Sequence, residues 1–144
     1  MTSKFLIGYD GSPASKRAAD FALNSARTHG ASLVIAHVLE WSPYSFLTPE
    51  EIEERHKRRA EEMERAEAAV ITPLKESLDD SGIEVETVIR YGHIADTLCD
   101  IAEKYAVSQI FIGRDGSSAI AARVFGSVAG SVVQTTPVPC TIVP

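Results

Sequence analysis

Five short apolar segments recur along the chain, and longer helix-like segments separate them. Each apolar segment is almost continuously hydrophobic and rich in β-branched or aromatic residues. Strands buried on both faces of a parallel sheet have this composition, whereas half-exposed strands alternate apolar and polar residues. The five segments are Phe5 to Ile7, Leu33 to Leu39, Val85 to Ile89, Ile110 to Ile112 and Cys140 to Val143. We therefore expect an α/β fold, a doubly wound parallel sheet with four helices and right-handed crossovers.

The first helix is expected between Ser12 and Gly30. Ser12 is a good N-cap, Pro13 suits the first helical position, and glycine is favoured just beyond a helix end. The buried face predicted from helical spacing consists of Ala18, Ala19, Ala22, Leu23 and Ala26.

The second helix is expected to begin after Thr48, and Pro73 should kink or split it. Its predicted apolar stripe comprises Ile52, Met63, Ala66, Val70, Leu74 and Leu78. The other faces pair acids with bases four residues later, at Glu51 and Arg55, Glu54 and Arg58, and Glu61 and Arg65, which favours a solvated surface. A third helix is expected from Ile94 to Tyr105, and a fourth from about Gly126 and Ser127.

Length and charge limit the possible classes of function. The 144 residues suit a single domain, and the net charge of -6 argues against nucleic-acid or anionic-membrane partners. No apolar run is long enough to span a bilayer and the N-terminus does not resemble a signal peptide, so we expect a cytoplasmic protein without membrane insertion. Cys99 and Cys140 are interpreted as reduced core residues, and the scattered histidines predict no metal site.

A glycine-rich segment follows the fourth predicted strand. Gly113 and Gly116 are followed, after nine residues, by Gly126 and Ser127 at a predicted helix start. Ligands of open parallel sheets bind at the carboxyl ends of the strands, and glycines and helix N-termini let backbone N–H groups approach an anion. The alternative is that these glycines form only a tight strand exit and a helix cap.

The spacing G-x2-G-x9-G-S, together with the order of elements, resembles the universal stress protein family. The resemblance extends over the whole chain and includes Leu6 to Ser12, His37-Val38, Tyr91-Gly92, Ile112-Gly113 and Thr136 to Cys140. It implies a Rossmann-like, five-stranded parallel sheet in the order 3-2-1-4-5. It further implies a homodimer built around the last strand, Cys140 to Val143, and ATP binding in the subgroup that carries the full loop motif.

The resemblance also implies roles for individual residues. Asp10 would contact the ribose, with Gly8 and Tyr9 close by, and Val38 would contact adenine through its backbone. The remaining pocket residues are Ile112 and Gly113, and the phosphate loop would comprise Gly116, Gly126, Ser127 and Val128. The alternative role for Asp10 is an Asx-type turn that caps the first helix, and the two roles are compatible.

Charged residues in the loop leave the number of phosphates open. A carboxylate at Asp115 would repel phosphates in a poorly solvated site unless a cation intervenes. Asp115 could hold Mg²⁺, point to solvent, or favour AMP or cyclic AMP over ATP. Arg114 and Arg123 could offset phosphate charge or simply be exposed.

No catalytic arrangement accompanies this pocket. The chain lacks G-x4-G-K-[ST] and any Ser-His-Asp or Cys-His arrangement. We therefore expect an ATP-binding regulatory protein whose state is read by an unidentified partner protein. Slow ATP hydrolysis, autophosphorylation at Ser127 or Ser12, and a ligand-free interaction dimer are the alternatives.

Overall fold

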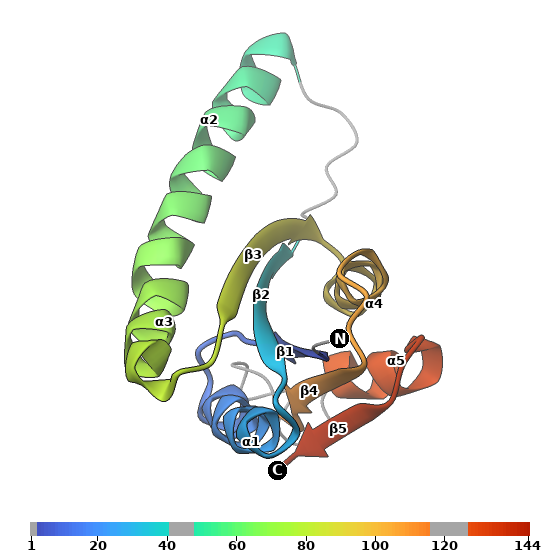
Figure 1. The fold of residues 1–144 in the computed structure, drawn as a ribbon. Helices are drawn as coiled ribbons and strands as arrows, with labels where there is room; N and C mark the ends of the chain where they lie inside the picture. The colour runs from blue at the N-terminus through green and yellow to red at the C-terminus, as the bar shows by residue number, and fades with distance from the viewer. Residues whose placement is uncertain (1–2, 41–47, 116–126) are drawn as a thin grey trace.

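The computed structural model describes residues 3–40, 48–115 and 127–144. Its centre is a five-stranded sheet in which every pairing is parallel and the order is β3-β2-β1-β4-β5 (Figure 1). The strands are β1 (Lys4–Gly8), β2 (Ser32–Glu40), β3 (Val85–Gly92), β4 (Gln109–Gly113) and β5 (Cys140–Val143). The predicted fold class and strand order are confirmed.

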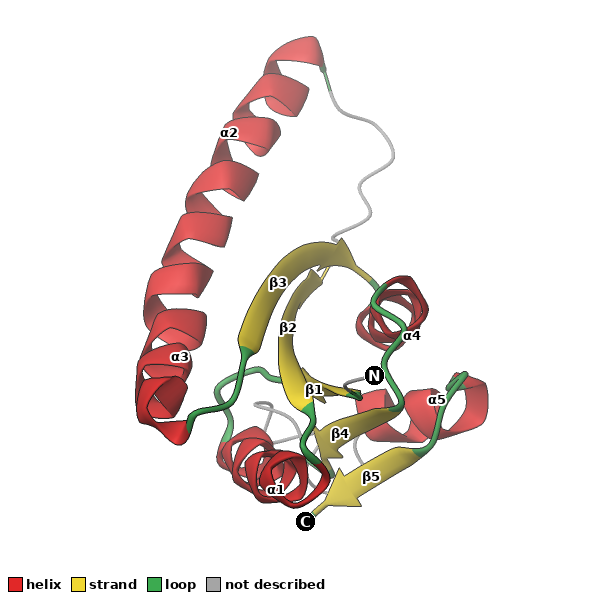
Figure 2. Ribbon diagram, in the orientation of Figure 1, coloured by secondary structure: helices red, strands yellow, loops and turns green. Residues whose placement is uncertain are grey.

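Helices cover both faces of the sheet (Figure 2). The helices α1 (Pro13–His29) and α3 (Thr72–Leu78) lie on one face, and α4 (Ile94–Lys104) and α5 (Ser127–Thr135) lie on the other. Successive residues of a strand point to opposite faces. In β2, for example, Ile35 therefore packs with the α1 face whereas Ala36 packs with the α4 face.

The helix α1 has the predicted boundaries. Ser12 is its N-cap, and the Ser15 N–H donates a hydrogen bond of 3.2 Å to the Ser12 Oγ. Gly30 ends the helix in the left-handed conformation, at a φ of 66°. The buried face consists of small residues, Ala14, Ser15, Ala18, Ala19, Ala22 and Ala26, so the helix axis lies close to the sheet.

The second helix is split, as Pro73 predicted. It consists of α2 (Pro49–Ala66), a π-helical segment η1 (Glu67–Ile71) and α3. Proline cannot donate a helical hydrogen bond, and its ring clashes with the carbonyl four residues earlier. The carbonyl four residues before Pro73 belongs to Ala69, inside this π-helical segment, and the regular helix resumes at Thr72.

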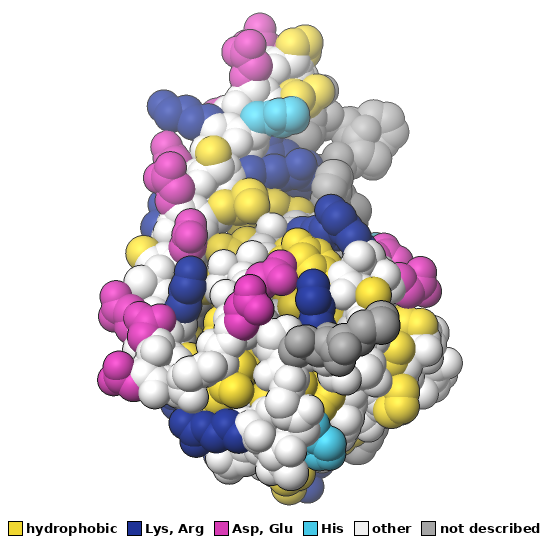
Figure 3. Space-filling model, viewed as in Figure 1, with side chains coloured by type: hydrophobic (Ala, Val, Ile, Leu, Met, Phe, Trp, Pro, Cys, Tyr) yellow, Lys and Arg dark blue, Asp and Glu magenta, His cyan; other side chains and the backbone are white. Residues whose placement is uncertain are grey.

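The predicted apolar stripe is wrong only at its first residue, because Ile52 is 44% exposed. The other predicted positions are buried at Ala66, Leu74 and Leu78 and half-buried at Met63 and Val70. The helix extends beyond the ends of β2 and β3, so no sheet surface faces its first turns (Figure 1). Acidic and basic side chains alternate along it (Figure 3), and the predicted pair of Arg58 and Glu54 is formed at 3.2 Å.

Candidate functional site

A cleft lies at the carboxyl ends of β1, β2 and β4, beneath the starts of α4 and α5. The chain winds in opposite directions from β1, toward β2 on one side and β4 on the other, which is where such folds bind ligands. About 590 Å³ of empty space, with the open solvent at its mouth included, lies within the cleft. Its lining residues are Gly8, Tyr9, Asp10, Ser15, Ala36, Val38, Ile94, Leu98, Ile112, Gly113, Arg114, Asp115, Val128 and Ala129.

The cleft brings together most residues that were singled out from the sequence. Those found in its lining are Gly8, Tyr9, Asp10, Val38, Ile112, Gly113, Arg114 and Val128. Gly116, Arg123 and Gly126 lie outside the described residues. Ser127 is the first residue of α5, but its side chain is also outside the described part.

The sequence interpretation missed several lining residues. They are Ser15, Ala36, Ile94, Leu98 and Ala129. Strand alternation could have identified Ala36, which precedes Val38 by two positions and therefore shares its face of β2. Ile94 and Leu98 are one turn apart on α4 and share one face of this helix, but their spacing does not show that this face reaches the cleft.

One wall of the cleft is apolar, and it continues into the hydrophobic core. Val38, Leu98 and Ile112 are 9%, 2% and 3% exposed and belong to the same core cluster. Each residue comes from a different element, β2, α4 or β4. An apolar slot of this kind accommodates a flat, weakly polar group such as a base.

Gly8 and Gly113 both lie where a Cβ atom would be crowded, but by different neighbours. A Cβ atom on Gly113 would lie 2.7 Å from the Ala14 carbonyl carbon and 2.8 Å from the Ser15 nitrogen, both of which are backbone atoms. A Cβ atom on Gly8 would instead lie 2.9 Å from Cγ2 of Ile112 and 3.0 Å from Cδ1 of Leu98. Packing of β4 against α1 is therefore sufficient to explain the glycine at position 113.

Asp10 forms the Asx turn that was one of its two expected roles. Its Oδ1 accepts a hydrogen bond of 2.9 Å from the Ser12 N–H. A carboxylate can accept about four hydrogen bonds through its two oxygens. The turn is therefore compatible with a ribose contact by the same side chain.

Asp115 and Arg114 stand side by side at the cleft. The Arg114 Nε lies 3.9 Å from the Asp115 Oδ1, and their side chains are 50% and 27% exposed. Asp115 is one of the residues that line the cleft. The neighbouring guanidinium offsets part of the repulsion that this carboxylate would exert on a phosphate.

The remaining ionisable side chain in the described cleft lining is Tyr9. Burial raises the pKa of Tyr9, and the nearby carboxylates of Asp10 and Asp20 raise it further, so the phenol is neutral at pH 7. Among the described residues, no group of three or more His, Cys, Asp or Glu side chains is placed to hold a metal ion. Within the same ranges, no helix is both long and apolar enough to cross a membrane.

Comparison with known proteins identifies relatives over the full length of the chain. The family model described as the universal stress protein family matches residues 1–144. A universal stress protein of Thermus aquaticus is 32% identical over 145 residues, covering 99% of both chains. The solved structure of universal stress protein UspA from Lactobacillus plantarum has a TM-score of 0.83 and 24% identity, covering 99% of this chain and 97% of its own.

Two further solved structures carry nucleotides. One is a universal stress protein in complex with cAMP, with a TM-score of 0.68 and 21% identity over 99% of this chain and 97% of its own. The other is the universal stress protein from Archaeoglobus fulgidus in complex with dAMP, with a TM-score of 0.66 and 20% identity over 100% and 98%. The full-length family match and the Thermus relative together show that this chain belongs to the universal stress protein family.

Proposed function

We propose that this chain is an adenine-nucleotide-binding regulatory protein, with ATP as its main ligand. The proposal rests on one observation. The same cleft is lined by an apolar slot, by the Asp10 carboxylate and by the start of α5. A nucleotide has the matching parts, a flat base, a sugar with hydroxyl groups and a negatively charged phosphate chain. Relatives of the same fold that hold cAMP or dAMP support this class of ligand.

The base and the sugar would use the ends of β1 and β2. Adenine would enter between Val38, Leu98 and Ile112, and its edge would bond to the backbone of Val38. The ribose hydroxyl groups would donate to the Asp10 carboxylate, since a carboxylate accepts two hydroxyl hydrogen bonds well.

The phosphates would extend toward the start of α5. Val128 and Ala129 in the first turn of this helix line the cleft, and a helix N-terminus offers unpaired N–H groups and the positive end of its dipole. Gly116, Gly126, Ser127 and Arg123 would complete the phosphate loop. Mg²⁺ could bridge the phosphates to Asp115, because this ion commonly binds one or two carboxylates together with phosphates.

A binding role suits these residues better than efficient catalysis. The G-x4-G-K-[ST] motif of P-loop enzymes does not occur in the sequence. Nucleotide occupancy would therefore act as a signal that a partner protein reads. Slow hydrolysis would be revealed by phosphate release that rises with Mg²⁺ and falls in Asp115→Asn.

Calorimetry on nucleotide-free protein tests the proposal. ATP, ADP, AMP and cyclic AMP are titrated with and without Mg²⁺ into the wild type, Asp10→Asn and Asp115→Asn. Asparagine at position 10 can still accept the Ser12 N–H bond, so Asp10→Asn removes charge while retaining the turn. We expect about tenfold weaker binding in Asp10→Asn, and Mg²⁺-dependent ATP binding that loses this dependence in Asp115→Asn. An absence of heat with all four nucleotides would refute the proposal.

We also propose that the chain forms a homodimer through β5. This strand is at the edge of the sheet order, and all four of its residues are only half-buried. An uncovered edge strand is a ready site for pairing. Sedimentation should show a dimer that Val143→Lys dissociates and Ile52→Lys, on the distant α2, does not. A wild-type monomer at 100 µM would contradict this assignment, at a concentration about 100 times a typical micromolar Kd.

A further inference from the structure

A buried histidine lies behind the nucleotide cleft and hydrogen-bonds to its backbone. His37 in β2 is 9% exposed, and its Nδ1 lies 2.7 Å from the carbonyl oxygen of Tyr9. A carbonyl oxygen only accepts hydrogen bonds, so Nδ1 carries the proton and donates it.

This bond attaches the chain to β2 one residue after the regular pairing of β1 ends. The last paired position of β1 with β2 is Gly8 opposite Ala36. One residue later, the Tyr9 N–H donates to the Ala36 carbonyl at 2.9 Å, and the Tyr9 carbonyl accepts from His37. Both backbone groups of Tyr9 are therefore bound to β2 immediately before Asp10.

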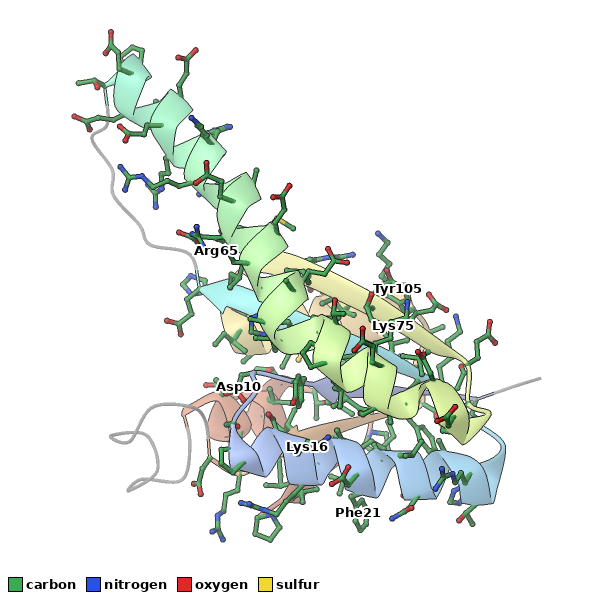
Figure 4. All side chains as sticks on the ribbon, turned by 90° about the vertical axis from the view of Figure 1, so that its left-hand side faces the viewer. Asp10, Lys16, Phe21, Arg65, Lys75 and Tyr105 are labelled. Carbon is green, nitrogen blue, oxygen red and sulfur yellow. The ribbon has the colours of Figure 1, made fainter. Side chains whose placement is uncertain are left out.

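The peptide unit that leads into Asp10 is held at both of its edges. Its carbonyl oxygen belongs to Tyr9 and receives the His37 bond, and its N–H belongs to Asp10 and points to the Ser15 Oγ at 3.4 Å. Because a peptide unit is planar, two such contacts fix its orientation. This plane fixes the N–Cα bond of Asp10, and the hydrogen bond from the Ser12 N–H to Oδ1 further restricts the direction of the Asp10 side chain before the start of α1 (Figure 4).

His37 is not among the residues that line the described cleft. The cleft-lining residues of β2 are Ala36 and Val38, and alternation along the strand places His37 on the opposite face, with Ile35. Its effect on a ligand must therefore pass through the Tyr9 backbone.

We propose that His37 is a positioning residue that orients Asp10 toward the ribose hydroxyl groups and so sets the preference for ribonucleotides. This assignment rests on the proposed nucleotide function. It differs from a general stabilising role, because it affects the part of the binding energy that comes from the hydroxyl groups and leaves the base and phosphate contacts unchanged.

Three variants separate these roles. His37→Asn keeps an N–H donor at the position of Nδ1, since both nitrogens are bonded to Cγ. His37→Gln moves the donor one carbon further out, and His37→Leu removes it. Circular dichroism and thermal melting first establish that each variant is folded, and His37→Gln provides the test if the leucine variant does not fold.

The measurement is the ratio of affinities for ATP and 2′,3′-dideoxy-ATP, which lacks both ribose hydroxyl groups. We expect the wild type and His37→Asn to bind ATP at least about tenfold more tightly than the dideoxy analogue, since a single charge-assisted hydrogen bond already contributes about this much. In His37→Leu and His37→Gln the ratio should fall to within about twofold of unity, with dideoxy-ATP affinity unchanged.

Several outcomes would contradict the assignment. If the substitutions weaken ATP and dideoxy-ATP binding equally, or leave the wild-type preference intact, His37 has only a structural role. A wild type that binds both nucleotides equally refutes the ribose role of Asp10 and this inference with it, whereas nucleotide binding itself stands. A wild type that binds neither refutes the proposed function.

Discussion

The two walls of the cleft are built in different ways. The wall next to α1 consists of main chain and a turn, where Gly113 touches the backbone of Ala14 and Asp10 holds the Ser12 N–H. The wall next to α4 consists of side-chain tips, chiefly those of Leu98 and Ile112. We call these the α1 wall and the α4 wall.

The two walls should therefore have different roles. The α1 wall holds polar groups in place, and the α4 wall adapts to the shape of the ligand. Backbone atoms in contact cannot move without displacing a whole helix, so the α1 wall holds its polar groups at fixed positions. Side-chain tips can change rotamer at small cost, so the α4 wall can adjust to the shape of a base. Substitutions in the α1 wall should therefore affect the fold, and substitutions at the tips of the α4 wall should affect ligand fit.

Leu98→Ala should have the largest effect, because this residue belongs to both the α4 wall and the core. It is 2% exposed and contacts the central strands, so its truncation leaves a cavity that costs about 2–5 kcal/mol of unfolding free energy. Urea denaturation measures this loss. The control is Ile94→Ala, one turn earlier and only half-buried, which should cost less. Equal costs would mean that the fuller burial of Leu98 adds nothing to stability beyond what the half-buried Ile94 contributes.

Gly113→Ala should destabilise the α1 wall by about 1–3 kcal/mol, because the new methyl group would overlap the backbone of α1. Thermal and urea unfolding give the cost. Ala14→Gly in the same chain removes the Ala14 Cβ, one of the three atoms that crowd the new methyl group, but leaves the backbone overlap. The double variant should therefore recover only part of the loss. Full recovery would show that side chains, not backbone, form this contact.

Local sequence signals predicted the α1 wall well. The cap at Ser12, the proline at Pro13 and the glycine at Gly30 fix the start and end of α1 within a few residues of sequence. The parallel-sheet topology then places Asp10 and Val38 at neighbouring strand ends. These features depend on local chemistry and on one general rule of open α/β sheets, and both can be read from the chain.

Features that depend on three-dimensional contacts were not predictable in the same way. The sequence does not show how far the sheet extends. The apolar spacing that includes Ile52 therefore predicted a buried side chain, but no sheet surface faces this part of α2 and Ile52 is exposed. The rotation of α4 about its axis decides that Leu98 reaches the cleft. The close approach of Ala14 explains Gly113 only once α1 is placed against β4.

Gly8→Ala should weaken ATP binding more than it lowers stability, whereas Gly113→Ala should mainly lower stability. The added methyl group would meet Cγ2 of Ile112 and Cδ1 of Leu98, which are side-chain atoms rather than backbone atoms, so the stability cost should be smaller than that of Gly113→Ala. The displaced tips would narrow the adenine slot, and we expect about tenfold weaker ATP binding in calorimetry. A large loss of stability with unchanged affinity would mean that the α4 wall is as rigid as the α1 wall.

The smallest effect is expected at Tyr91, outside both walls. Its hydroxyl donates to the Glu62 Oε2 at 2.6 Å and connects β3 to α2. Burial, followed by this bond, raises the pKa of Tyr91 to about 12 from an ordinary 10.0. Because the folded pKa is the higher one, the stabilisation is complete below pH 10 and is lost as the pH rises toward 12.

Tyr91→Phe should cost less than about 1 kcal/mol at pH 7, since the bond lies near the surface. Hydrogen exchange of the α2 amides should be faster in this variant at pH 7. Helical circular dichroism should decline between pH 10 and 12 in the wild type and less steeply in the variant. Nucleotide affinity should not change, because α2 contributes no residue to the described cleft lining. A weaker affinity in Tyr91→Phe would show that α2 is coupled to the cleft, and nucleotide binding would then depend on α2 as well as on the two walls.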